Sequence, residues 1–407
     1  MGKKSAAVAE LAADKEALRC PVLPHDSKIT LKTIRDAIPA HCFERSYVLS
    51  FSYLGVNLLV ALWLGVLAWH FLPSLPMWAQ CLLWPVYIFV QGCVMTGLWV
   101  IGHECGHGGF SDSELVNDIV GYVVHSCLAV PYKAWAWSHM LHHKNCNSLE
   151  NDEVFVPAEY DPDHDADSVL KHNVITRIRE LFVFLFLGWP GYLTFHITGK
   201  KWDTWPWNSH FFPWSSMFPK RLRMHIVLSD VCLAVLCYAV YRIGSAFGWM
   251  PVLLLYFLPL LVTNGWLVTI TGLQHTNMAV PHFRGDSWSW LRGALGTIDR
   301  SFGPLLDLCF HHIQDTHVMH HLFSDMPFYH AVEATAAVKR SPLGPYMLYD
   351  DTPVALALWR IFGNCRAVRN KGGIVFFQNP KTEKQGFNAK DYPECQPLPD
   401  VPCAKPE

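Results

Sequence analysis

Two long stretches without a charged side chain constrain the fold of this chain more than any other feature. Residues 51–72 and 78–101 contain no Asp, Glu, Lys or Arg. Each stretch is longer than the roughly 20 apolar residues that an α-helix needs to cross a lipid bilayer. Only the five residues PSLPM, at 73–77, separate them. The sequence therefore predicts a tight hairpin of two transmembrane helices.

Two further apolar stretches, residues 226–249 and 251–273, predict a second hairpin. The first of them is the weakest of the four, because it contains Asp230 and Arg242, and charged side chains in a membrane face protein or the interface. Residues 115–131 and 181–197 are shorter, and GWPG at 188–191 is expected to break the second of these, so both are interpreted as interfacial or re-entrant segments. The predicted fold class is an all-α integral membrane protein, with four transmembrane helices in two hairpins and a cytosolic helical cap.

The composition agrees with a membrane protein and narrows its chemistry. Of the 407 residues, 51% are hydrophobic, and the mean hydropathy is +0.16. A net charge of -2 gives no hint of nucleic-acid binding. The 13 cysteines form no C-x-x-C motif, which argues against a disulfide scaffold and against a thiolate zinc site.

Eight of the 22 histidines form three clusters with helical spacing. Residues three and four apart lie on one face of a helix, so the imidazoles of a cluster can converge on one metal ion. The clusters are His103 and His107 in HECGH, His139, His142 and His143 in HMLHH, and His317, His320 and His321 in HVMHH. Imidazole suits iron, copper or zinc. Eight imidazoles exceed the needs of one tetrahedral zinc, so the sequence predicts two metal ions. Cys105, inside the first cluster, is interpreted as an apolar filler.

The distribution of Lys and Arg predicts which side of the membrane carries these clusters. The turn at 73–77 has neither residue and the turn at 242–250 has only Arg242, whereas residues 131–225 and both terminal regions are well supplied. The positive-inside rule then places both termini and all three clusters in the cytosol. His275, just past the last apolar stretch, is either a ninth ligand or a polar residue at the interface. His311 and His312 are expected to have structural or supporting roles.

The sequence around these clusters resembles that of the membrane fatty acid desaturases, which carry three such histidine boxes in this order. Longer strings resemble the acyl-lipid delta-12 (omega-6) branch and its omega-3 relatives. They are IRDAIPAHCFERS at 34–46, WVIGHECGHGGFSD at 99–112, ENDEVFVP at 150–157, LQHTN at 273–277, GTIDRSFG at 296–303 and THVMHHLFSDMPFYHAVEAT at 316–335. The likeness runs from about residue 28 to about residue 378. It implies a cytosolic N-terminal segment at 1–48, a desaturase domain at 49–378 and a cytosolic tail at 379–407.

The resemblance also implies a function for the histidines. The eight box histidines match those that hold a non-haem di-iron centre in the family, and His275 matches an additional iron ligand. The family uses dioxygen and two electrons to remove hydrogens from adjacent methylenes of an acyl chain, leaving a cis double bond and water. Iron with nitrogen ligands and open coordination positions suits this oxidation, whereas zinc has no redox chemistry. No catalytic side chain is expected beyond the metal ligands.

Other residues near the boxes are candidates for supporting roles. Glu104, Asp152 and Asp315 are candidates for orienting imidazoles through hydrogen bonds, with a plain structural role as the alternative. The acyl chain is expected in an apolar tunnel shielded from water. Four tryptophans are interpreted either as its lining or as a belt at the membrane interface: Trp99, Trp135, Trp137 and Trp266.

The sequence contains no haem-binding HPGG string, no dinucleotide fingerprint and no cysteine set for an iron–sulfur cluster. Electrons are therefore expected from a separate donor, and the resemblance suggests cytochrome b5 and its reductase at the endoplasmic reticulum membrane. HCFERS and THVMHHLF favour conversion of oleoyl to linoleoyl, while Gly108 and ENDE at 150–153 leave an omega-3 enzyme (linoleoyl to linolenoyl) or a bifunctional enzyme open. A di-iron lipid hydroxylase or epoxygenase and a metal transporter are the alternatives from other classes.

Overall fold

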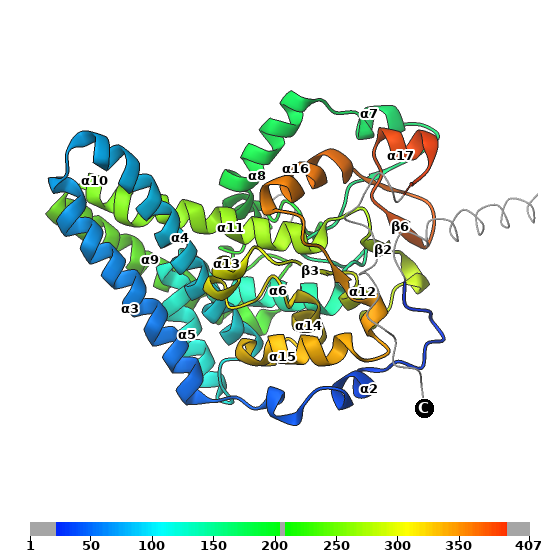
Figure 1. Ribbon diagram of the computed structural model, residues 1–407, viewed down its shortest axis with the longest axis horizontal. Coiled ribbons are helices and arrows are strands. Elements are labelled where there is room, and N and C mark those ends of the chain that lie inside the picture. The colour runs from blue at the N-terminus through cyan, green and yellow to red at the C-terminus, as the bar shows by residue number, and fades with distance from the viewer. Residues whose placement is uncertain (1–21, 204–207, 389–407) are drawn as a thin grey trace, which may run out of the picture.

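The computed structural model describes residues 22–203 and 208–388, and within them the chain is mainly helical (Figure 1). Parts of the predicted terminal segments at 1–48 and 379–407 lie outside the described residues. Five helical runs in the described part are long and apolar enough to cross a membrane. They contain α3 (Tyr47–Phe71), α4 (Met77–His107), α8 (Val174–Phe195), α9 (Arg223–Phe247) and α11 (Leu258–His275). The last run begins with α10 (Trp249–Val252) and a π-helical turn at Leu253–Phe257.

Four of these runs coincide with the predicted spans, and the fifth, α8, differs from expectation. Length and composition therefore do not single out four transmembrane helices. The expected break at GWPG is wrong, because α8 continues through Pro190 to Phe195. A proline inside an apolar helix is tolerated where neighbouring groups satisfy the freed backbone carbonyl, and α4 likewise continues through Pro85.

The segment after α4 bends sharply. Helices α5 (Glu114–Cys127) and α6 (Tyr132–Asn145) meet at 106°, and together they pass the same test as one broken span or a re-entrant loop. Ala129 at the bend has a positive φ of 57°. Pro131, two residues later, is the N-cap of α6. This bend turns α6, with its three histidines, back toward the end of α4.

Shorter elements cover one end of the long helices, on the right of Figure 1. The helices are α2 (Leu31–Asp36), α7 (Ala166–Leu170), α12 (Trp290–Leu295), α13 (Pro304–Cys309), α14 (His317–Leu322), α15 (Phe328–Lys339), α16 (Val354–Asn364) and α17 (Pro380–Gln385). Three two-stranded ladders depart from the all-α prediction. They pair β1 (Glu159–Tyr160) with β5 (Val368–Arg369) and β3 (Ile298–Asp299) with β4 (Leu348–Tyr349) in parallel, and β2 (Pro281–Phe283) with β6 (Ile374–Phe376) antiparallel.

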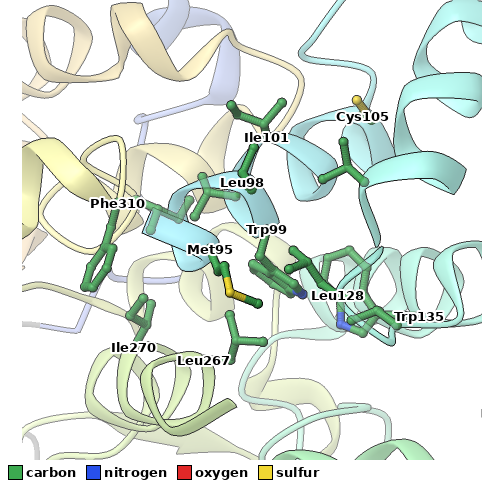
Figure 2. Close-up of a cluster of buried hydrophobic side chains, with 14 of the residues drawn as sticks. Met95, Leu98, Trp99, Ile101, Cys105, Leu128, Trp135, Leu267, Ile270 and Phe310 are labelled. Carbon is green, nitrogen blue, oxygen red and sulfur yellow. The ribbon is translucent and has the colours of Figure 1, made fainter. Parts of the chain in front are cut away.

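Helix α4 is the centre of the core, with α3, α5 and α11 packed around it. Figure 2 shows Met95 and Trp99 of α4 facing Leu267 of α11. A Cβ atom on Gly92 would lie 2.5 Å from the Cβ of Val262, so α4 and α11 approach as closely as they do only because residue 92 is glycine. Because lipid is as apolar as a side chain, such close backbone packing is what holds membrane helices together.

The outer helices expose apolar surface. On α3 and α9, Leu62 and Val235 are more than 60% exposed, and most large side chains of both helices are accessible. A protein surface in water rarely carries an apolar area of this extent, so these helices are suited to contact lipid.

Candidate metal centre

The four elements that carry the predicted ligands end at or pass through one buried region. His103 and His107 lie in the last two turns of α4, so the helix extends six residues beyond the predicted end of the span at 101. Gly108, with φ of 76°, ends it in the left-handed conformation that favours glycine. His275 is the last residue of α11 and not a residue beyond it. Helices α6 and α14 supply the other six histidines.

One group of imidazoles gathers five of the predicted ligands. Their ligand atoms all lie within 4.8 Å of one another. The Nε2 atom of His139 is 2.9 Å from Nε2 of His103 and 3.1 Å from Nε2 of His143. The five are His103, His107, His139, His143 and His320.

A second group forms around His275. Its Nε2 atom lies 3.3 Å from Nε2 of His142 and 3.0 Å from Nε2 of His317. His321 belongs to the same group, and its ring lies 5.0 Å from that of His275 between centroids. The structure therefore brings all eight box histidines and His275 together. The two groups adjoin, because the rings of His143 and His321 stack at 4.1 Å with an interplanar angle of 14°.

In two of the three boxes, HMLHH and HVMHH, the histidines divide between the two groups. Pairs with i, i+4 spacing stay together, as His139 and His143 do in one group and His317 and His321 in the other. In these two boxes the remaining histidine lies in the other group: His142 of HMLHH is in the second group, and His320 of HVMHH is in the first. Each of the two helices α6 and α14 thus contributes to both groups, which places two candidate ion sites side by side.

The chemistry of these groups fits metal ions. The Nε2 atoms of His107, His320 and His321 are buried and have no hydrogen-bond partner among the described residues. A buried polar atom without a partner costs about 1–3 kcal/mol, and a metal bond would satisfy it. Burial, together with neighbouring imidazoles such as His142, lowers the pKa of His317 to about 3, and burial also lowers the pKa of His320 and His321. These rings are therefore neutral, which is the form that binds a metal.

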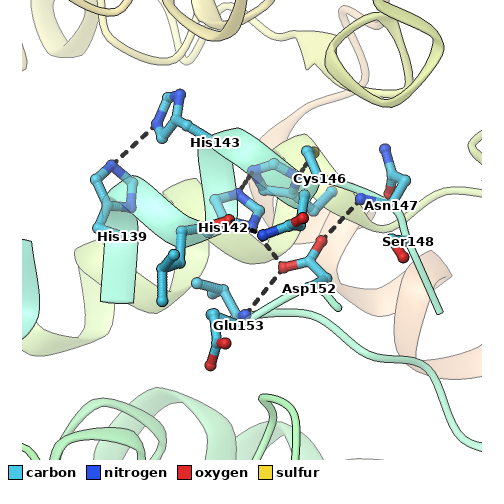
Figure 3. A network of polar contacts seen from close by, with 12 residues as sticks. His139, His142, His143, Cys146, Asn147, Ser148, Asp152 and Glu153 are labelled. Carbon is cyan, nitrogen blue, oxygen red and sulfur yellow. Dashed lines mark hydrogen bonds and ion pairs between the residues drawn. The ribbon is translucent and has the colours of Figure 1, made fainter. Parts of the chain in front are cut away.

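Carboxylates fix the orientation of two of the imidazoles. Asp152 accepts a 2.6 Å hydrogen bond from Nδ1 of His142, and its other oxygen accepts the backbone N–H of Asn147 at 2.8 Å (Figure 3). Glu104 lies 3.0 Å from Nδ1 of His103. In both cases the bond to Nδ1 leaves Nε2 directed at the other imidazoles, as in carboxylate–histidine–metal arrangements.

Asp315 hydrogen-bonds an imidazole, but not one of the proposed ligands. It pairs at 2.9 Å with His312, which belongs to neither group, and this hydrogen bond raises the pKa of His312. His311 is also outside the groups. Its Nε2 lies 3.2 Å from the Asn57 amide, so it joins α3 to the segment before α14. Cys105 is buried in the apolar core, as its interpretation as a filler requires.

An apolar cavity of about 350 Å³ reaches the first group at His139. Trp135 lines it and stacks on His139 at 4.6 Å, and Phe155 lines it and stacks on His275 at 5.6 Å. Trp99 is also part of the wall. Trp137 and Trp266 are not: Trp137 donates a hydrogen bond to the carbonyl of Met217, and Trp266 packs against Phe310 in the core. The cavity therefore borders the first group directly, and Phe155 lies between the cavity and His275 of the second group.

Sequence reasoning missed two residues beside the centre. Cys146 belongs to the second group of potential ligands, because its Sγ lies within 4.8 Å of a ligand atom of each of His142, His275 and His321, and 3.8 Å from Nδ1 of His275. Its spacing of four from His142 was the available signal. His125 stacks on Trp99 at 5.4 Å, and its Nε2 donates to the carbonyl of Trp99 at 3.1 Å. His125 has no second histidine three or four residues away, so the spacing of the histidines gave no reason to consider it.

Comparisons with known proteins point in one direction. Residues 79–353 match the family described as "Fatty acid desaturase". The chain is 44% identical to "Omega-6 fatty acid desaturase, endoplasmic reticulum isozyme 1" of Glycine max, over 86% of this chain and 90% of the relative. It is 46% identical to "Delta(12)-acyl-lipid-desaturase" of Punica granatum, with the same coverage. "Bifunctional desaturase/conjugase FADX" of Vernicia fordii is 42% identical, over 90% of this chain and 95% of the relative.

Proposed function

Because the chain belongs to the fatty acid desaturase family, we propose that it converts oleoyl to linoleoyl chains at two iron ions held by nine imidazoles. The enzyme is an oxidoreductase. Two adjoining groups of buried imidazoles beside an apolar cavity are the observation that carries this proposal. The proposed ligands are His103, His107, His139, His142, His143, His275, His317, His320 and His321.

The protein's own part in the reaction is to position the acyl chain and exclude water. The iron ions, when bound, would supply the oxidising power that breaks two C–H bonds. In balance, a CH2–CH2 unit, one O2, two electrons and two protons give a CH=CH unit and two waters. An acyl chain in the cavity would lie against Trp135 and Phe155, whose rings stack on imidazoles of the two groups. Those rings would set how close a methylene pair comes to the ions.

The names of the relatives favour delta-12 action over the omega-3 alternative. The Glycine max and Punica granatum proteins are named for omega-6 and delta-12 desaturation. Gly108, which pointed toward omega-3 enzymes, has a structural role here because it ends α4. One relative is named as a desaturase and conjugase, so the product has to be identified chemically.

Expression in a yeast that makes only monounsaturated fatty acids tests the function directly. We expect new linoleate in the lipids by gas chromatography, because the host supplies the oleoyl substrate and the electron donor. Linolenate formed only after linoleate feeding would favour the omega-3 alternative, and a hydroxylated chain would favour a hydroxylase. If folded protein is present in the membrane but neither linoleate nor linolenate forms, the proposal is contradicted. The electron donor can be tested in the same way. Microsomes that lack cytochrome b5 should convert less oleoyl to linoleoyl than microsomes that contain it.

We further propose the membrane setting and the electron source. The apolar helices and the name of the Glycine max relative support the endoplasmic reticulum membrane. Lys and Arg placement supports cytosolic termini and a cytosolic metal centre, where cytochrome b5 and its reductase would deliver electrons. A terminal epitope tag reached only from the lumen would contradict this topology.

Asp152→Asn should weaken iron binding without removing a ligand. An amide accepts a weaker hydrogen bond from Nδ1 of His142 than a carboxylate does, so the ring loses basicity and a fixed orientation. We expect a loss of roughly 10- to 100-fold in iron affinity or activity, measured as iron content during chelator titration. Asp163→Asn, on an exposed turn, is the control. Equal iron retention in both variants would contradict the role given to Asp152.

A further inference from the structure

A third group of potential ligands lies outside the centre described above. It consists of His41 and Cys42, from the 3-10 turn Ala40–Phe43, and His330 and Glu333, from α15. One ligand atom from each residue lies within 4.8 Å of those of the other three. We call these four residues the outer cluster. They are not box histidines, and none belongs to the two imidazole groups.

The fold brings the outer cluster together from two distant segments. His41 and Glu333 are 292 residues apart in sequence. His330 and Glu333 are three residues apart on α15 and so share one face of the helix. The N-terminal segment runs along α15 (Figure 1), and Cys42 is fully buried in the apolar cluster that also contains Val338. This packing holds the turn against the helix at the position of the four side chains.

The separations are close to those of a tetrahedral zinc site. Bonds of 2.0–2.3 Å from zinc to nitrogen, oxygen and sulfur place neighbouring ligand atoms about 3.5 Å apart. The Nε2 atom of His41 is 2.9 Å from Oε2 of Glu333 and 3.7 Å from Sγ of Cys42. The ring of His330 lies edge-on to that of His41 at 5.5 Å. Small side-chain rotations would therefore suffice to direct all four atoms at one ion.

Charge and exposure also suit a divalent cation. A thiolate and a carboxylate together carry two negative charges, which balance the ion when both imidazoles are neutral. The side chains of His41 and Glu333 are 52% and 53% exposed, so an ion can enter from solvent, while Cys42 forms the buried side. In the absence of metal, burial and the nearby Glu333 raise the pKa of the Cys42 thiol to about 11. Metal binding would release that proton, as it does at other thiolate sites.

We propose that the outer cluster binds one zinc ion, with His41, Cys42, His330 and Glu333 as its four ligands. Sulfur, nitrogen and carboxylate ligands are the set that zinc takes in proteins, and four protein ligands make a closed, structural site. The donor set differs from the histidine-rich centre because it includes a carboxylate and only two imidazoles.

The position of the site gives the zinc a structural purpose. Three residues after Cys42, Arg45 donates hydrogen bonds to the carbonyl of Gly108 at 2.7 Å and to that of Asp325 at 3.0 Å. Gly108 follows the last histidine of α4, and Asp325 lies between α14 and α15. An ion that fixes the turn to α15 would therefore hold Arg45 where it ties together the ends of two ligand-bearing helices.

Metal analysis of the purified full-length protein tests the proposal. After dialysis against zinc and then metal-free buffer, we expect one zinc per chain in addition to iron. Glu333→Gln and His330→Ala should weaken zinc binding by at least roughly tenfold and leave the iron content unchanged, which shows that the variants are folded. Glu44→Gln changes an exposed carboxylate nearby that is not in the cluster, and it should keep its zinc.

Cobalt substitution identifies the sulfur ligand. Cobalt in the outer cluster should give a thiolate-to-cobalt charge-transfer band that is lost in Cys42→Ser and kept in Cys81→Ser, which removes an exposed thiol on α4. Wild-type protein that takes up no zinc, zinc content unchanged by Glu333→Gln, or a cobalt band unaffected by Cys42→Ser would each overturn the proposal.

Discussion

Replacing His320 by alanine is expected to abolish desaturation and to release bound iron. The ring of His320 lies 4.6 Å from those of His103 and His143 and 4.8 Å from that of His107, so it contacts much of the first imidazole group. Its Nε2 is buried without a hydrogen-bond partner in the described structure. Loss of this proposed ligand would remove a metal bond and leave a cavity that water can enter. Because even residues that only orient a ligand contribute 10- to 100-fold, we expect a loss of more than a hundredfold.

The measurement combines linoleate formation in yeast with iron content of the purified protein. His164→Ala is the matched control, because His164 lies exposed on the turn before α7 and should change neither quantity. Size-exclusion chromatography in detergent would show whether His320→Ala retains the fold. A folded His320→Ala protein with normal turnover would contradict the assignment of the first imidazole group.

Gly188→Leu is expected to block the cavity while leaving the metal centre intact. Gly188 lines the cavity on α8, where an added Cβ would already lie 3.2 Å from Cγ1 of Val268. The rest of a leucine side chain would have to enter the space that we assign to the acyl chain. Because a misplacement of about 1 Å can cost on the order of a hundredfold in rate, we expect activity to fall by about that factor.

Iron content separates this effect from damage to the centre, since none of the nine proposed ligands lies on α8. Leu187→Phe is the control on the same helix, because Leu187 is 56% exposed and does not line the cavity. Should Gly188→Leu keep full activity, the acyl chain must lie elsewhere. Loss of iron in this variant would instead mean that α8 supports the metal centre.

Much of the framework was predictable because its signals are local. A long run of apolar residues favours a membrane-spanning helix, and the ends of the four predicted spans fall within six residues of the helical runs found. Helical spacing likewise predicted which histidines share a helix face, and the i, i+4 pairs of all three boxes do remain together. The continuity of α8 through Pro190 was less predictable, since it depends on how neighbouring groups satisfy the helix backbone.

The sequence by itself determined that this chain forms long apolar helices and carries three sets of potential metal ligands, because both properties are encoded over a few helical turns. Only the tertiary structure decided that His142 lies with His275 and His321, that His320 lies with histidines of the first two boxes, and that His275 is part of the second group. It alone brought Cys42 to Glu333 across almost the whole chain. Such groupings depend on how separate helices dock, and docking is set by packing between side chains that no spacing within one helix records.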